Sequence, residues 1–369
     1  MGHYVLYNFK GIFITLIIAI IGGVLFQLLH IPVPWLLGPM IAMVLGKNML
    51  QWDFAWPYHL RNTGMMIIGY TIGLSMTLAA LREMALQLPT MLLMTVLLML
   101  LCAGIALIVS MLSDSDYRSA LLGSIPGGLT QVIVLAEETK GINLAVVTVT
   151  QVIRLMMIVI AMPLLVLMPF FGQHAGDNGG TAALPIETTV SLFPHIILFA
   201  LVGVILALLG NKIHFPTAYL LGPMIGTAVL QVLGFTGPHL PGFVINAAQL
   251  LIGTHVGLML KASEIEHKGR TFSLAIGSGL MLMGGSVVLS FILGWLHDMS
   301  RATALLATAP GGMDQMGIIA HAIEADLSIV SGYQLFRTFF IYFAIPPILK
   351  LLFRMMGDKR KQKRHGVTT

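Results

Sequence analysis

Long apolar segments, separated by short polar interruptions, follow one another along the whole chain. An apolar stretch of about 18 residues or more is long enough to cross a bilayer as a helix. The pattern therefore predicts an all-α polytopic membrane protein. The segments lie at roughly 11–29, 33–50, 64–80, 88–112, 119–136 and 143–171, and then at roughly 191–210, 217–234, 243–260, 272–296, 302–322 and 326–354.

Composition supports a bilayer as the solvent of this chain. Hydrophobic residues make up 57% of the sequence and charged residues only 9%, whereas soluble domains carry about 25% charged residues. Lys10 precedes an apolar run that continues to Leu29 without a small-residue cleavage site. We therefore expect the first segment to remain as a span rather than to leave as a signal peptide.

The second half of the chain repeats the motifs of the first half in the same order. The sequence Leu-Leu-Gly-Pro-Met-Ile at 36–41 recurs at 220–225, and Pro126-Gly127-Gly128 recurs as Pro310-Gly311-Gly312, each 184 residues later. A spacing this constant indicates a duplication rather than chance. We predict a first membrane repeat at 1–171, a linker outside the cytoplasm at 172–190, a second membrane repeat at 191–354 and a basic cytoplasmic tail at 355–369.

Each Pro-Gly-Gly motif interrupts an apolar segment, and the interruption predicts a broken or re-entrant helix. Proline lacks an N–H group and glycine adds backbone freedom, so carbonyl and N–H groups are freed there and need partners. In transporters, paired Gly/Pro-interrupted segments point to the substrate site. The alternative is a kink, or a close helix crossing that needs small residues.

Charge placement favours five crossings in each half. If both Pro-Gly-Gly segments enter and leave on one side, most loop lysines and arginines fall on the cytoplasmic side, as the positive-inside rule requires. An odd number of crossings per half would insert the two repeats upside down relative to each other. The chain is therefore expected to be an inverted repeat, with twelve crossings as the alternative.

Polar residues follow the breaks and lie within the last segment of each half. Asp314 stands where the first half has Thr130, and a carboxylate there would carry a coupled proton or bind a cation such as sodium. Its alternative role is an ion pair with Arg154 or Arg337. The predicted binding residues are Pro126, Gly127, Gly128, Thr130, Gln131, Gln151, Arg154, Pro310, Gly311, Gly312, Asp314, Gln315, Gln334 and Arg337.

The two buried arginines allow two interpretations. Arg154 and Arg337 each follow a glutamine by three residues, on the same helical face. The planar guanidinium suits a carboxylate or a phosphate, which favours a small anionic or zwitterionic solute as the partner. The alternative is that the arginines extend toward the membrane surface or cap carbonyls freed at the breaks.

Several chemistries are not indicated. Cys102 is the only cysteine, the histidines are scattered and no phosphate-binding loop occurs, so we expect no cofactor, no metal and no enzyme activity. His255 is a lone polar residue on an apolar segment, for which a packing role is expected. The basic tail is expected to contact anionic lipid headgroups rather than nucleic acid. The sequence does not decide whether the protein forms a homo-oligomer.

The paired Leu-Gly-Pro-Met and Pro-Gly-Gly motifs, with glutamine and arginine downstream, resemble the membrane AbrB family, also labelled AmoA-like or "ammonia monooxygenase". The resemblance covers nearly the whole chain except the tail, and it implies a duplicated membrane domain. The founding bacterial member is described as an inner-membrane protein that regulates expression of an adaptive-response gene. Two hypotheses result: a secondary transporter or exporter in the bacterial inner membrane, and a membrane-embedded regulator or sensor.

Overall fold

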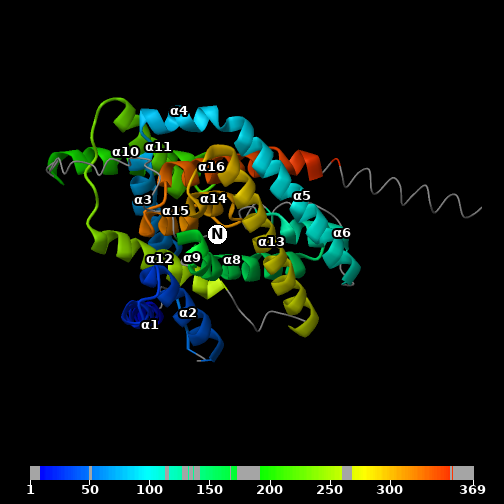
Figure 1. Ribbon diagram of the computed structural model, residues 1–369. Coiled ribbons are helices and arrows are strands. Elements are labelled where there is room, and N and C mark those ends of the chain that lie inside the picture. Colours follow the sequence, from blue (N-terminus) through cyan, green and yellow to red (C-terminus); the bar gives the residue numbers. More distant parts are fainter. Residues whose placement is uncertain are drawn as a thin grey trace, which may run out of the picture.

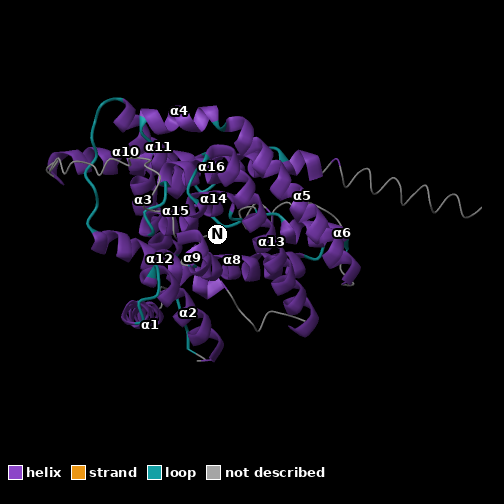
Figure 2. Ribbon diagram, viewed as in Figure 1, coloured by secondary structure: helices purple, strands orange, loops and turns teal. Residues whose placement is uncertain are grey.

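Every regular element of the described chain is a helix (Figures 1 and 2), which confirms the predicted all-α class. The computed structural model describes residues 9–49, 52–112, 116–126, 132, 136, 142–166, 168–172, 192–259, 268–349 and 351. The predicted linker lies outside them except for 172, and the predicted tail lies outside them entirely. The first half contains α1 (Phe9–Leu28), α2 (Pro34–Met49), α3 (Tyr58–Ser75), α4 (Leu78–Leu86), α5 (Leu88–Leu112), α6 (Tyr117–Ser124), α8 (Leu144–Val166) and α9 (Pro169–Gly172). The second half contains α10 (Leu192–Lys212), α11 (Ala218–Val232), α12 (Gly242–Met259), α13 (Lys268–His297), α14 (Arg301–Thr308), α15 (Met313–Ala322) and α16 (Leu327–Phe343).

Six of the described helices are long and apolar enough to cross a membrane: α1, α5, α8, α10, α12 and α13. The bent pair of α3 and α4 makes a seventh candidate. These helices confirm the polytopic membrane character. Because α2, α11 and α16 have only 16, 15 and 17 residues, the count of ten crossings stays a prediction.

The segment expected at 64–80 is not one straight helix. It begins earlier, as α3, and bends by 84° before α4. Thr77 starts the second helix, because its hydroxyl accepts a hydrogen bond from the Ala80 amide at 3.2 Å. An N-cap of this kind satisfies one of the amides that a new helix leaves free.

Corresponding helices of the two halves share their bounds. Helices α3 and α12 each have 18 residues and start 184 residues apart, as do the eight-residue helices α6 and α14. Helices α5 and α13 pack side by side (Figure 1), and His297 at the end of α13 hydrogen-bonds Thr90 at the start of α5 at 2.8 Å. The two helices therefore run antiparallel. This direction agrees with an inverted repeat, while the orientation of the halves across a bilayer stays a prediction.

Glycines join the two halves by close backbone contacts. A Cβ atom at Gly69 of α3 would lie 2.3 Å from the Leu220 carbonyl oxygen of α11, and one at Gly253 of α12 would lie 2.3 Å from the Leu36 carbonyl oxygen of α2. Small residues allow such close approach in membrane helix packing. Each half therefore contributes a helix to the other, and the Leu-Gly-Pro-Met segments are the surfaces on which these glycines pack.

We expect Gly253→Ala to lower the free energy of unfolding by about 1–3 kcal/mol, because the added methyl group meets backbone that cannot move aside easily. Thermal unfolding of the detergent-purified protein measures this. The matched control is Gly277→Ala in α13, where a Cβ meets nothing within 4 Å. Equal stabilities of the two variants would contradict the packing interpretation.

Candidate functional site

The predicted break in the second half is present. Helix α14 ends at Thr308, and α15 begins at Met313 with Gly312 as its N-cap. The residue before Pro310 is extended, with Ala309 at φ −55° and ψ 129°, as a following proline requires. In the first half, Ile125 ends α6 with φ −67° and ψ 125°, so the chain leaves the helix in the same way.

In the second half, two side chains of α16 bind the carbonyls that the break leaves free. Gln334 Nε2 donates to the carbonyls of Leu306 at 2.7 Å and Ala309 at 3.1 Å. Arg337 donates to Ala309 at 2.7 Å and to Gly311 at 3.0 Å. The Arg337 guanidinium also donates to the Gln334 side-chain oxygen, which fixes both side chains together.

The first half repeats this arrangement from α8. Gln151 Nε2 donates to the carbonyls of Leu122 at 2.7 Å and Ile125 at 3.0 Å. Arg154 Nη1 donates to Gly123 at 3.1 Å and to Ile125 at 2.9 Å, and its Nη2 donates to Gln151. We call Gln151–Arg154 the first clamp and Gln334–Arg337 the second clamp.

The clamps support the carbonyl-capping interpretation of the arginines. The last carbonyls of a helix have no partner within it and carry partial negative charge, so a buried guanidinium can be satisfied by them instead of by a carboxylate. Among the described residues, Asp314 forms no ion pair with Arg154 or Arg337. The alternative in which Asp314 locks the bundle through an arginine is therefore wrong in this structure.

Asp314 lies in the first turn of α15 and is only 9% exposed. Its carboxylate accepts a hydrogen bond from Gln315 Nε2 at 2.9 Å, and it is near the positive end of the helix dipole. A Cβ atom at Gly312 would lie 2.5 Å from the Asp314 Oδ1 atom. The second glycine of the motif therefore leaves room for the carboxylate at the helix start.

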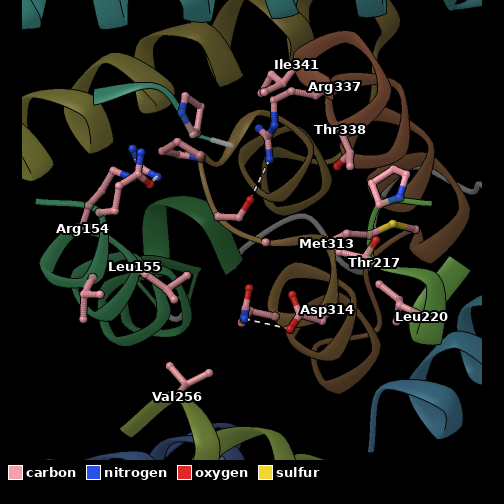
Figure 3. Close-up of a pocket in the computed structure, with 18 of the residues that line it drawn as sticks. Arg154, Leu155, Thr217, Leu220, Val256, Met313, Asp314, Arg337, Thr338 and Ile341 are labelled. Carbon is pink, nitrogen blue, oxygen red and sulfur yellow. Dashed lines mark hydrogen bonds between the residues drawn. The ribbon is translucent and has the colours of Figure 1, made fainter. Parts of the chain in front are cut away.

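Both breaks border one cavity of about 170 Å³ (Figure 3). Figure 3 shows Arg154 and Arg337 on separate elements around it, with Asp314 away from both guanidinium groups. Of the predicted residues, those that line it are Pro126, Gln151, Arg154, Pro310, Gly311, Gly312, Asp314, Gln315 and Arg337. Gln334 is buried in the second clamp and does not line the cavity, and Gly127, Gly128, Thr130 and Gln131 lie outside the described residues.

Sequence reasoning missed several lining residues. Arg61 of α3 and His255 of α12 both line the cavity. Arg61 falls between the predicted apolar segments 33–50 and 64–80, and His255 was expected in packing. Thr217, Thr338 and Tyr342 add hydroxyl groups. A comparison of the halves could have indicated the charged residues, because Arg61 corresponds to Ile245 in the second half.

The cavity has an excess of positive charge. Of the described residues that line it, three are arginines and one is an aspartate, so these residues carry a formal charge of +2 with His255 neutral. Two polar atoms beside it, Arg154 Nε and Gln315 Oε1, are buried without a hydrogen-bond partner among the described residues. Buried polar groups without partners are uncommon. The Arg154 Nε donor suits an anionic group, whereas the Gln315 Oε1 acceptor suits a donor such as the ammonium of a zwitterion.

We expect Gln334→Leu to destabilise the protein by about 1–3 kcal/mol, since it leaves the buried Leu306 carbonyl without a donor. The Ala309 carbonyl loses one donor and keeps Arg337. Thermal unfolding in detergent measures the loss. Gln27→Leu makes the same chemical change on the exposed face of α1 and should have little effect. Equal stability of Gln334→Leu and the wild type would show that the clamp does not hold the break.

The chain is similar to known bacterial proteins over almost its full length. A family model described as transition state regulatory protein AbrB matches residues 35–353. Over 367 residues the chain is 26% identical to the uncharacterized protein YhjN of Bacillus subtilis (strain 168), covering 94% of each chain. It is 24% identical over 336 residues to AbrB of Escherichia coli (strain K12), named as a candidate regulator, with 91% of this chain and 94% of that protein covered. The family match spans most of the helices described above, and the chain belongs to the AbrB family.

Proposed function

We propose that this protein is a secondary transporter or exporter of a small anionic or zwitterionic solute, and that it has no enzyme activity. The observation that carries the proposal is the basic cavity bordered by both helix breaks. Paired broken segments are typical of transporter sites. The volume of about 170 Å³ is below the range of about 300–1,000 Å³ that drug-sized ligands occupy, so the cargo is a small molecule.

Asp314 is our candidate for the coupling residue. It is the acid among the described residues that line the cavity, and it forms no ion pair there. A carboxylate that is not bound by an arginine can exchange a proton or a cation such as sodium with the solvent. Intramembrane acids commonly have such functions. The proposal places this exchange at the start of α15, beside the cargo.

A counterflow screen of amino acids, carboxylates and phosphonates in proteoliposomes identifies a cargo. With that cargo, we expect Asp314→Asn to abolish accumulation driven by a pH or sodium gradient, because the amide can no longer carry the coupled charge. Asp53→Asn, at an exposed position outside the cavity, is the matched control. Unchanged transport and unchanged pH dependence of Asp314→Asn would rule out the coupling role.

The second candidate function is a membrane-embedded regulator or sensor that binds a ligand in the same cavity without transporting it. The name of the Escherichia coli relative favours it. The basic residues of the last twenty positions would contact anionic lipid headgroups or transmit the signal. In either function we place the protein in the bacterial inner membrane with this tail in the cytoplasm, and as a monomer or homo-oligomer.

Deletion of residues 359–369 separates the two functions. A transporter should keep counterflow activity within about twofold, because the tail is remote in sequence from both breaks. A regulator that acts through the tail should lose its effect on gene expression, measured by comparing transcripts of cells that carry the full-length and shortened chains. Loss of transport together with an unchanged expression pattern would contradict both assignments of the tail.

A further inference from the structure

The three arginines of the cavity differ in how they are bonded. Arg154 and Arg337 each donate to two or more backbone carbonyls and to a glutamine oxygen. These bonds occupy the terminal N–H groups that face the breaks. Arg61 forms no hydrogen bond and no ion pair with any residue in the described part of the chain, and it is half-buried at the cavity wall.

Helix stability does not explain Arg61. It is the fourth residue of α3, where the helix dipole is positive and a cation is unfavourable. The position does not demand a polar side chain either. Its equivalent in the second half is Ile245, which is buried within the main hydrophobic core. An isoleucine therefore fits the same place in the duplicated scaffold.

The surroundings of Arg61 leave its donors available. Besides the two clamp arginines and Tyr342, the titratable groups that line the cavity with Arg61 are Asp314 and His255. Both are close enough to interact with Arg61 electrostatically but are not bonded to it. Tyr342 donates to the His214 carbonyl at 3.0 Å and Thr338 to the Gln334 carbonyl at 2.8 Å, and neither hydroxyl accepts a hydrogen bond from Arg61. Within the described part of the chain, Arg61 is thus the cavity arginine whose fork is open.

We propose that Arg61 is the residue that binds the anionic group of the cargo, an oxyanion such as a carboxylate, phosphate or phosphonate. The inference rests on the proposed function of the cavity and names the binding residue within it. A guanidinium fork presents paired N–H groups that match the two oxygens of such groups. The clamp arginines add a positive field, but their Nη groups already donate to carbonyls and to glutamine. The Arg154 Nε group has no partner among the described residues.

The test uses the full-length protein in a neutral detergent. Thermal unfolding is followed while chloride is replaced by acetate, phosphate or methylphosphonate at constant ionic strength, and separately with added phosphatidylglycerol. At least one soluble oxyanion should stabilise the wild type relative to chloride. Arg61→Gln should need an anion concentration at least about tenfold higher for the same stabilisation. This is the loss of affinity expected for one charged hydrogen-bonded contact.

Two further variants make the result specific. Arg82→Gln removes an exposed arginine outside the cavity and should respond to the anion as the wild type does. Arg61→Lys keeps the charge and loses the fork, so it should recover only part of the response. Arg61 forms no bond that the fold needs, so all three variants should fold.

The inference would be overturned if none of these oxyanions stabilised the wild type, or if Arg61→Gln were stabilised as strongly as the wild type. It would also be overturned if Arg61→Gln reduced only the stabilisation by phosphatidylglycerol, because the residue would then be a lipid contact. Failure of the proposed function is a different result. In that case the oxyanion response would depend on Arg61, but no bound solute would undergo counterflow.

Discussion

A backbone carbonyl in the interior of a membrane protein must have a donor, and this constraint shapes the centre of the molecule. Each Pro-Gly-Gly break frees carbonyls in the protein interior, where they need donors. The solution in both halves is a glutamine and an arginine one helical turn apart, on the helix that packs beside the break. Because one of the two donors is an arginine, the hydrogen bonds to the freed carbonyls also place a permanent positive charge in each half.

The scaffold is close to symmetric, whereas the chemistry at its centre is not. The clamps repeat almost bond for bond, and the glycine contacts of α3 on α11 repeat as those of α12 on α2. Within this frame, Asp314 replaces a threonine and Arg61 replaces an isoleucine. The two departures meet at one cavity. The corresponding helices and clamps thus supply the shape, and residues that differ between the halves supply an acid and an arginine without a bonded partner among the described residues.

The sequence predicted those features that depend on local chemistry. A consecutive Pro-Gly-Gly favours a helix break, and a Gln-x-x-Arg spacing places both side chains on one face, so the breaks and the residues around them were predictable. The role of Arg154 and Arg337 was not, because carbonyls and carboxylates both suit a guanidinium and only geometry distinguishes them. Arg61 was missed because it reaches the cavity through the packing of α3 against α11 and α15, which local patterns do not report.

The bonding of the clamps also limits what they can do for a ligand. An anion that took the Nη groups of Arg337 would have to displace the carbonyls of Ala309 and Gly311. Ala309 would keep the Gln334 donor, but Gly311 would lose its Arg337 donor, and a carbonyl left without a donor costs about 1–3 kcal/mol. This loss would offset much of a charged hydrogen bond's gain. An arginine without prior bonds carries no such cost. Selection for a stable break and selection for ligand affinity therefore act on different arginines of the same cavity.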